Sequence, residues 1–88
     1  MNLNHVRYFL ILFKEQHFGS AAKLCGIAQP SLSMAIKRLE RDVGGALFLR
    51  KPQCKATPLA LHLQPYLEKI SHAVTIAERE AKRFQKSK

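Results

Sequence analysis

The chain is short and strongly basic. It has 88 residues, with 15 lysines and arginines against 6 acidic residues, and a formal net charge of +9. Such a chain forms one small domain with a thin core, and its charge favours an anionic partner, with nucleic acid ahead of an acidic membrane surface. The longest apolar run, Tyr8–Phe13, is too short to cross a bilayer.

The two cysteines are too few and too scattered for a disulfide framework or a zinc site. Cys25 lies in an apolar helical context and is expected in the core, whereas Cys54 is expected to be an exposed free thiol. Free thiols and the absence of a secretory signal at the start predict a cytoplasmic protein. We expect no metal and no cofactor.

Two helices are expected in the first part of the chain. Apolar residues recur at helical spacing from Asn2 to Gln16, and an asparagine at the start can cap this helix. A shorter helix is expected from Phe18 to Cys25, ended by Gly26. His5 and His17 are expected at the surface or as caps, because no metal-ligand spacing links them.

The segment from Gln29 to Val43 is predicted to be the second helix of a helix-turn-helix. A short helix, a tight turn that contains Gly26 and a longer helix form that pattern, and Pro30 suits the first helical position of the longer helix. The Gly44-Gly45 pair stops it. One face is an apolar stripe of Leu32, Ile36, Leu39 and Val43, and the opposite face carries Pro30, Met34, Lys37, Arg38 and Arg41.

A β-hairpin and a long helix are expected to follow. Leu47–Leu49 and Lys55–Thr57 each favour a short strand, and the basic, proline-containing turn between them would make a wing. Thr57 is also a good N-cap for the last helix, with Pro58 at its first position. The helical pattern continues to about Gln85, and Pro65 predicts a bend near the start of this helix.

Apolar residues of the last helix follow the heptad spacing of a helix that pairs with another helix. At about 1.5 Å per residue, the helix would span roughly 40 Å and outreach the rest of the domain. A second copy of the chain is therefore the expected support. The predicted dimerisation residues are Leu63, Leu67, Ile70, Val74, Ala77, Ala81 and Phe84.

The outward face of the Gln29–Val43 helix meets the physical requirements for binding in a major groove. Its N-terminal N–H groups and dipole attract phosphate. Short polar side chains near its start reach base edges, Gln29 an adenine edge for example, while long cations hold the backbone and the wing lies over the adjacent minor groove. The candidate DNA-binding residues are Gln29, Pro30, Ser31, Ser33, Met34, Lys37, Arg38, Arg41, Arg50, Lys51 and Lys55.

Other interpretations stay open at this point. The basic face could be the solvated side of an ordinary core helix, in a helical protein-interaction module that uses the heptad helix without recognising DNA. Attachment to a membrane surface is disfavoured because acidic residues interrupt the polar face of the last helix. An enzyme is not expected, since the chain lacks a glycine-rich phosphate loop, paired carboxylates and an activated nucleophile. His62 and His72 are expected to be exposed.

The order of these segments resembles the DNA-binding domain of LysR-type transcriptional regulators. The resemblance rests on "YF" in the first helix, the block "AAKLCGIAQPSLSMAIKRLE", the "LFLR" after it and "TPLA", and it covers essentially the whole chain. It implies a mainly α fold, with a winged helix-turn-helix over residues 1–57 and a linker helix over residues 58–88 that dimerises antiparallel with its twin. It also implies operator DNA of dyad symmetry, with Gln29, Pro30, Ser31, Ser33, Met34, Lys37 and Arg50 at or near that DNA.

The chain departs from the family pattern at several positions. Ala28 replaces a usual serine, which removes a cap and a phosphate contact. Met34 stands where a base is frequent and would touch a thymine methyl instead. Leu49 replaces a common acid, Cys25 replaces a usual leucine, and "TPLA" lacks the family's glycine.

Members of that family are considerably longer and carry a C-terminal domain that binds a small effector. The resemblance therefore implies that the chain is an N-terminal fragment. Effector binding, and a choice between dimer and tetramer, would belong to the longer protein.

Overall fold

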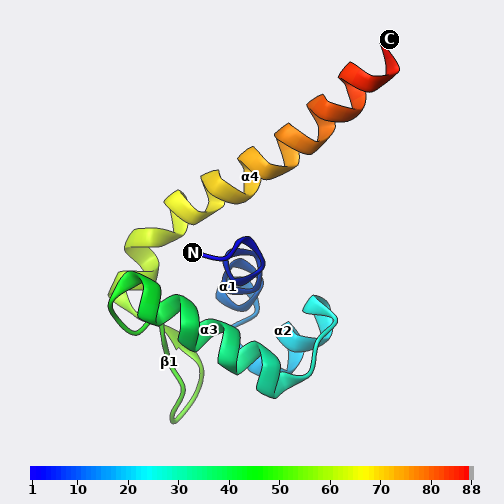
Figure 1. The fold of residues 1–88 in the computed structure, drawn as a ribbon. Coiled ribbons are helices and arrows are strands. Elements are labelled where there is room, and N and C mark those ends of the chain that lie inside the picture. Colours follow the sequence, from blue (N-terminus) through cyan, green and yellow to red (C-terminus); the bar gives the residue numbers. More distant parts are fainter. Residues whose placement is uncertain (88) are drawn as a thin grey trace.

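The structure is a computed structural model that describes residues 1–87. Three helices form a compact group, a short antiparallel hairpin lies beside them, and a long helix extends away as an arm (Figure 1). The molecule is accordingly elongated, with extents of 55 × 26 × 19 Å. The expected fold class, a mainly α winged helix-turn-helix followed by a linker helix, is confirmed. The elements are α1 (Leu3–Glu15), α2 (Phe18–Cys25), α3 (Gln29–Val43), β1 (Phe48–Leu49), β2 (Lys55–Ala56) and α4 (Pro58–Lys86).

Polar caps explain where the first two helices begin. The side chain of Asn2 accepts hydrogen bonds from the backbone N–H groups of Asn4 and His5, and the His17 imidazole accepts one from the N–H of Ser20. These bonds satisfy N–H groups that have no partner inside the helix. The expectation that His17 is a surface or cap residue is confirmed.

The ends of α2 and α3 depend on glycine. Gly26 (φ +73°) and Gly44 (φ +82°) both adopt the left-handed conformation, and each stands directly after the last residue of its helix. A residue with a Cβ atom is strained there. The start of α3 has no side-chain cap because Ala28 occupies the N-cap position, so proline in the first turn is the remaining start signal.

The core lies where α1, α2 and α3 meet β1 and the first turns of α4. The ring of Phe9 is fully buried and lies 5.7 Å from the ring of Phe13 and 5.5 Å from that of Phe48. Cys25 is buried as predicted, and burial raises the pKa of its thiol. α3 contributes its predicted apolar stripe, with Val43 half-buried at its end and the fully buried Leu32, Ile36 and Leu39.

The hairpin is present but shorter than predicted, with two residues in each strand. Leu47 lies outside the strand because its N–H donates to the Glu40 carboxylate of α3 (N···O 2.7 Å). Its carbonyl accepts the N–H of Thr57 (2.9 Å). The carbonyl of Thr57 does not complete the pair with Leu47, because it accepts the N–H of Leu61 in the first turn of α4. The Thr57 side chain caps that helix by accepting the N–H of Ala60.

The prediction that Cys54 is exposed was wrong. The residue is half-buried and packs against the core cluster, because it lies beside Phe18 and Arg50 around a hollow between α2 and the hairpin. Burial raises the pKa of its thiol, and the positive charge of Arg50 opposes that rise.

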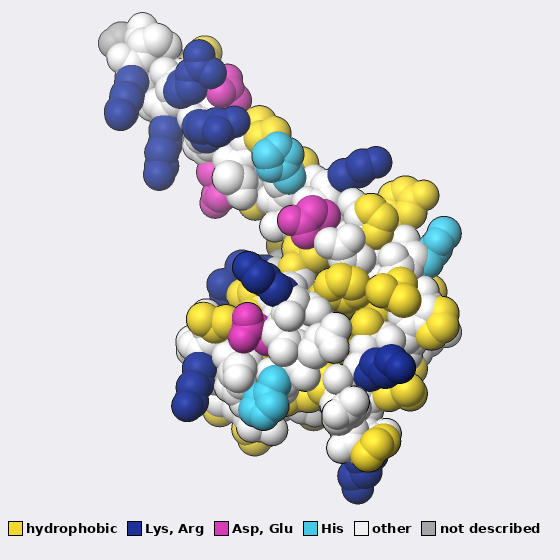
Figure 2. Space-filling view, turned by 180° about the vertical axis from the view of Figure 1, so that it is seen from behind, with side chains coloured by type: hydrophobic (Ala, Val, Ile, Leu, Met, Phe, Trp, Pro, Cys, Tyr) yellow, Lys and Arg dark blue, Asp and Glu magenta, His cyan; other side chains and the backbone are white. Residues whose placement is uncertain are grey.

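α4 begins in the core and then leaves the domain. Ala60 is fully buried, and most residues after Leu67 are exposed. Pro65 lies inside the helix, and the first, yellow-green turns of α4 run in a different direction from the rest (Figure 1), as a missing backbone N–H predicts. Seen from behind, hydrophobic side chains gather where the arm joins the domain (Figure 2).

Candidate nucleic-acid interface

One face of α3 turns away from the core and carries the centre of the predicted recognition surface. Met34 is 52% exposed, and Pro30, Lys37 and Arg41 are exposed as well. On the opposite face of the same helix, Leu32, Ile36 and Leu39 are completely buried. The face therefore presents an apolar side chain among long cations to whatever lies outside the protein.

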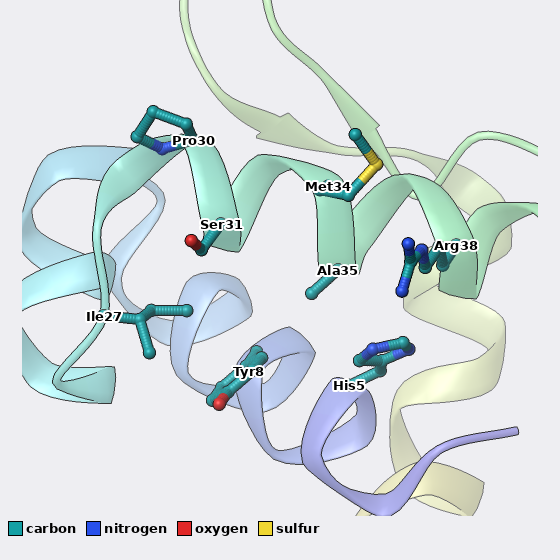
Figure 3. A pocket seen from close by; sticks show the side chains of 8 residues that line it. All are labelled: His5, Tyr8, Ile27, Pro30, Ser31, Met34, Ala35 and Arg38. Atoms are coloured by element: carbon teal, nitrogen blue, oxygen red, sulfur yellow. The ribbon is translucent and has the colours of Figure 1, made fainter.

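A hollow of about 430 Å³ lies beside this face, between α3 and α1 (Figure 3). Ser31 and Arg38 line it from α3, and His5 and Tyr8 line it from α1. His5 is half-buried there, so the expectation of a surface position was wrong; it packs between two helices, and its Nδ1 atom has no hydrogen-bond partner among the described residues. In Figure 3, Arg38 lies directly above the His5 ring.

On the other side of the face, Arg50 connects the hairpin to α3. Its Nη1 donates to the Ser33 hydroxyl (3.1 Å), and its Nη2 donates to Oε1 of Glu40 (3.4 Å). Its guanidinium carbon also lies 4.8 Å from the centre of the Phe18 ring, a distance typical of a cation–π contact. The side chain is only 30% exposed, so Arg50 is engaged with the protein itself.

Glu40 was not among the candidate residues. Its Oε2 accepts from the backbone N–H groups of Leu47 (2.7 Å) and Phe48 (3.3 Å), while Oε1 faces Arg50. The Glu40 side chain is 16% exposed. It anchors the start of β1 to α3, and the only signal for it in the sequence is that it shares a side of α3 with Ser33.

The remaining predicted cations are placed differently from Arg50. All of them are exposed, and the ion pairs found within residues 1–87 include none of them. The nearby Asp42 lies 3.9 Å from the α-amine of Met1. The exposed cations are Lys37, Arg38, Arg41, Lys51 and Lys55.

The polar residues at the start of α3 lie close to the hairpin or to α1. Gln29 is exposed and lines a hollow of about 620 Å³ with Arg50, Gln53 and residues of α2. Ser33 is half-buried because Arg50 covers it, and Ser31 is exposed on the α1 side. The structure thus arranges the predicted base-contacting side chains along both borders of the outward face.

The predicted dimerisation residues fall into two groups. Leu67 is 2% exposed in the protomer's own core, and Leu63 packs against that core, so these two positions stabilise the domain itself. Ile70 is 36% exposed and Val74 is half-buried. Farther along the arm, the exposed members are Ala77, Ala81 and Phe84.

Other kinds of site find little support in the described residues. No three His, Cys, Asp or Glu side chains of residues 1–87 lie together in a way that could hold a metal ion. His62 and His72 are exposed on α4, as predicted. Within residues 1–87, every helix is too short or too polar to cross a membrane.

Two curated relatives are informative because they match different lengths of the chain. BudR from Klebsiella aerogenes, an HTH-type transcriptional regulator, is 54% identical over 50 residues, which are 57% of this chain and 35% of BudR. AlsR from Bacillus subtilis, also an HTH-type transcriptional regulator, is 34% identical over 87 residues, which cover 93% of this chain and 29% of AlsR. The chain thus spans about a third of the length of these relatives.

Solved structures show the same fold. The DNA-binding domain of BenM, crystallised in complex with catB site 1 DNA, superposes with a TM-score of 0.88 at 36% identity, and the match covers 97% of each chain. A full-length OxyR variant from Pseudomonas aeruginosa gives a TM-score of 0.90 at 33% identity over 94% of this chain and 28% of OxyR. Residues 3–61 match the family described as bacterial regulatory helix-turn-helix protein, lysR family. The chain belongs to the lysR family of bacterial regulatory helix-turn-helix proteins.

Proposed function

We propose that this chain is the DNA-binding and dimerisation module of a bacterial transcription regulator. α3 enters the major groove of a double-stranded operator, with Gln29 and Ser33 near base edges and Lys37 and Arg41 near phosphates. The hairpin cations Lys51 and Lys55 lie over the adjacent minor groove. The module binds DNA without performing a chemical reaction, and it works in the bacterial cytoplasm.

The observation that carries this proposal is the outward face of α3. Lys37 and Arg41 are exposed there and take part in none of the ion pairs of the described residues. Unpaired cations on one face of a protein with a net charge of +9 repel one another until an anionic partner neutralises them. A duplex supplies regularly spaced phosphates around a groove wide enough for a helix.

The likeness to BenM supports the same proposal. That DNA-binding domain was crystallised on a DNA site, and it matches this chain over nearly its full length at 36% identity. In an equivalent docking of this chain, the exposed face of α3, with Met34 at its centre, would lie against the bases. Met34 then offers an apolar contact for a thymine methyl group.

The arm is proposed to join two copies of the chain. After Leu67 it has no core of its own to rest on, and an isolated helical extension is marginally stable in water. An antiparallel pairing of two arms would hold two copies of α3 apart at a fixed distance and would match an operator of dyad symmetry.

Two classes of substitution test the assignment of roles on α3. Gln29→Ala should reduce the discrimination between operator variants by about 1–3 kcal/mol at one base position. Lys37→Ala should weaken binding to all duplexes by a similar factor and reduce the slope of log affinity against log salt by about 0.9. The measurement is a fluorescence-anisotropy titration at two salt concentrations, with a duplex selected from a random pool.

The same titration separates the proposal from its rival, a protein-interaction module that does not recognise DNA. Retention of the wild-type chain on duplex DNA that falls steeply with salt supports DNA binding. Weak retention even at low salt supports the rival. Identical behaviour of the Gln29 and Lys37 variants would contradict the division between base readout and phosphate contact.

A further inference from the structure

The basic residues around the recognition face are not equivalent, because Arg50 alone is engaged on several sides by the protein. Its guanidinium donates to Ser33 and to Glu40 and lies over the ring of Phe18. Lys51 and Lys55 on the same hairpin are exposed. A cation that already has a carboxylate partner gains less from a phosphate than a solvated one does.

We infer that Arg50 is a positioning residue, which orients the Ser33 hydroxyl for base readout and does not itself neutralise a phosphate. The inference rests on the proposed function, since it specifies how the same surface reads DNA. It differs from the expectation drawn from the sequence, in which Arg50 is one more cation at the DNA.

The geometry at Ser33 supports this role. The guanidinium has only donors, so the Ser33 oxygen must be the acceptor in their 3.1 Å contact. The hydroxyl proton therefore points away from Arg50 and can donate to an acceptor outside the protein. In a major groove such acceptors are the purine N7, the guanine O6 and the thymine O4, whereas cytosine and adenine also present amino donors. A Ser33 hydroxyl held in this way favours bases that present a hydrogen-bond acceptor to it.

Glu40 and Phe18 keep Arg50 in place. Glu40 reaches Arg50 with Oε1 while its other oxygen is bound to the backbone of β1, so the carboxylate cannot swing away without releasing the hairpin. The Phe18 ring lies 4.8 Å from the guanidinium carbon. Because the planar fork of arginine bonds Ser33 and Glu40 through different nitrogens, a lysine at this position cannot reproduce both bonds.

The test uses the whole chain and a duplex selected from a random pool with the wild-type protein. Affinities are measured for a set of duplexes with one base pair changed at a time, and Ser33→Ala identifies the position that Ser33 reads. Arg50→Lys keeps the charge and should lower discrimination at that position roughly two- to tenfold, the effect of one hydrogen bond. In a chain that already carries Ser33→Ala, Arg50→Lys should not lower the discrimination at that position any further.

Arg50→Met combined with Glu40→Gln removes the pair without changing the net charge and supplies a second test. It should lose the same discrimination and keep the wild-type salt slope. Lys51→Met is the matched control on the same hairpin: it should weaken all duplexes equally and reduce the slope by about 0.9. Circular dichroism melting of each variant reports folding, and Arg50→Lys provides the answer if the double variant does not fold.

The outcomes separate the inference from the proposed function. One outcome is that Arg50→Lys discriminates between duplexes like the wild type, while the double variant lowers the salt slope by about 0.9 as Lys51→Met does. Arg50 would then be a phosphate contact. The inference would be overturned, and the proposed function would stand. If the wild-type chain shows no sequence-dependent binding to any selected duplex, the proposed function fails and the inference fails with it.

Discussion

At the scale of single residues, the position of a charged side chain around the axis of α3 decides whether it is exposed or engaged. Successive residues are about 100° apart, so Glu40 turns toward the hairpin while its neighbour Arg41 turns outward. Glu40 is largely buried and Arg41 is exposed. The sequence shows that Ser33 and Glu40 share a side of the helix. It does not show that an arginine from another element reaches both, because that contact depends on how the hairpin packs.

Glu40 should contribute measurably to stability. Glu40→Ala leaves the N–H groups of Leu47 and Phe48 without their acceptor and Arg50 without its carboxylate partner. We expect the free energy of unfolding to fall by about 1–3 kcal/mol, the range for an unsatisfied buried polar group. Urea denaturation followed by circular dichroism measures the change.

Two variants make that measurement specific. Glu40→Gln retains an acceptor oxygen for the backbone and should recover part of the loss. Glu78→Ala removes an exposed acid from α4 and should leave the stability nearly unchanged. A Glu40→Ala variant as stable as the wild type would show that the backbone of β1 finds other partners, and the anchoring role of Glu40 would be wrong.

At the scale of the elements, local signals in the sequence were sufficient for the helices but not for the hairpin. The first helix was predicted from Asn2 to Gln16, and those two residues prove to be its N-cap and C-cap. Caps and glycines act within a few residues, so a sequence reveals them. The hairpin is shorter than predicted because Glu40, which belongs to a different element, accepts the N–H of Leu47.

The end of α3 provides a test at this scale. Gly44 has φ +82°, where a Cβ atom is strained, so Gly44→Ala should lower the free energy of unfolding by about 1–2 kcal/mol. Asparagine tolerates this conformation better than alanine, and Gly44→Asn should therefore lose less. Thermal unfolding of the two variants, compared at equal protein concentration, shows which of them is less stable.

A neighbouring glycine serves as the contrast. At Gly45 the backbone is not in the left-handed region, but an added Cβ would lie 2.9 Å from Cδ2 of Leu59. The obstacle there is the flexible end of a side chain, so asparagine offers no advantage over alanine at Gly45. If Gly44→Asn were less stable than Gly44→Ala, strain in the backbone would not be the reason for glycine at this C-cap.

At the scale of the whole molecule, the arm changes its role along its length. A heptad pattern in a sequence records that apolar residues share one face, but it does not say what covers them. The structure divides the pattern: Leu63 and Leu67 contact the protomer's own domain, whereas Ile70 and Val74 begin the part that extends beyond it. Figure 2 shows the same transition, with basic side chains prominent along the distal arm.

Lysines at Ile70 and Val74 should therefore separate the copies without unfolding the domain. Both residues lie after Leu67, the last arm residue of the core. The double variant Ile70→Lys/Val74→Lys would place two charges in a helix–helix contact, and we expect it to sediment as a monomer where the wild type sediments as a dimer. Its affinity for a duplex with two half-sites should fall far more than its affinity for a single half-site, because paired binding is lost.

A matched variant distinguishes the position of the charges from their number. His72 and Thr75 are exposed on the opposite side of the same helix, so His72→Lys/Thr75→Lys adds the same charge and should remain a dimer. If both double variants were monomers, general repulsion between strongly basic chains would explain the result. If Ile70→Lys/Val74→Lys remained a dimer, the two copies would have to meet elsewhere, and the spacing of the half-sites could no longer be attributed to the arm.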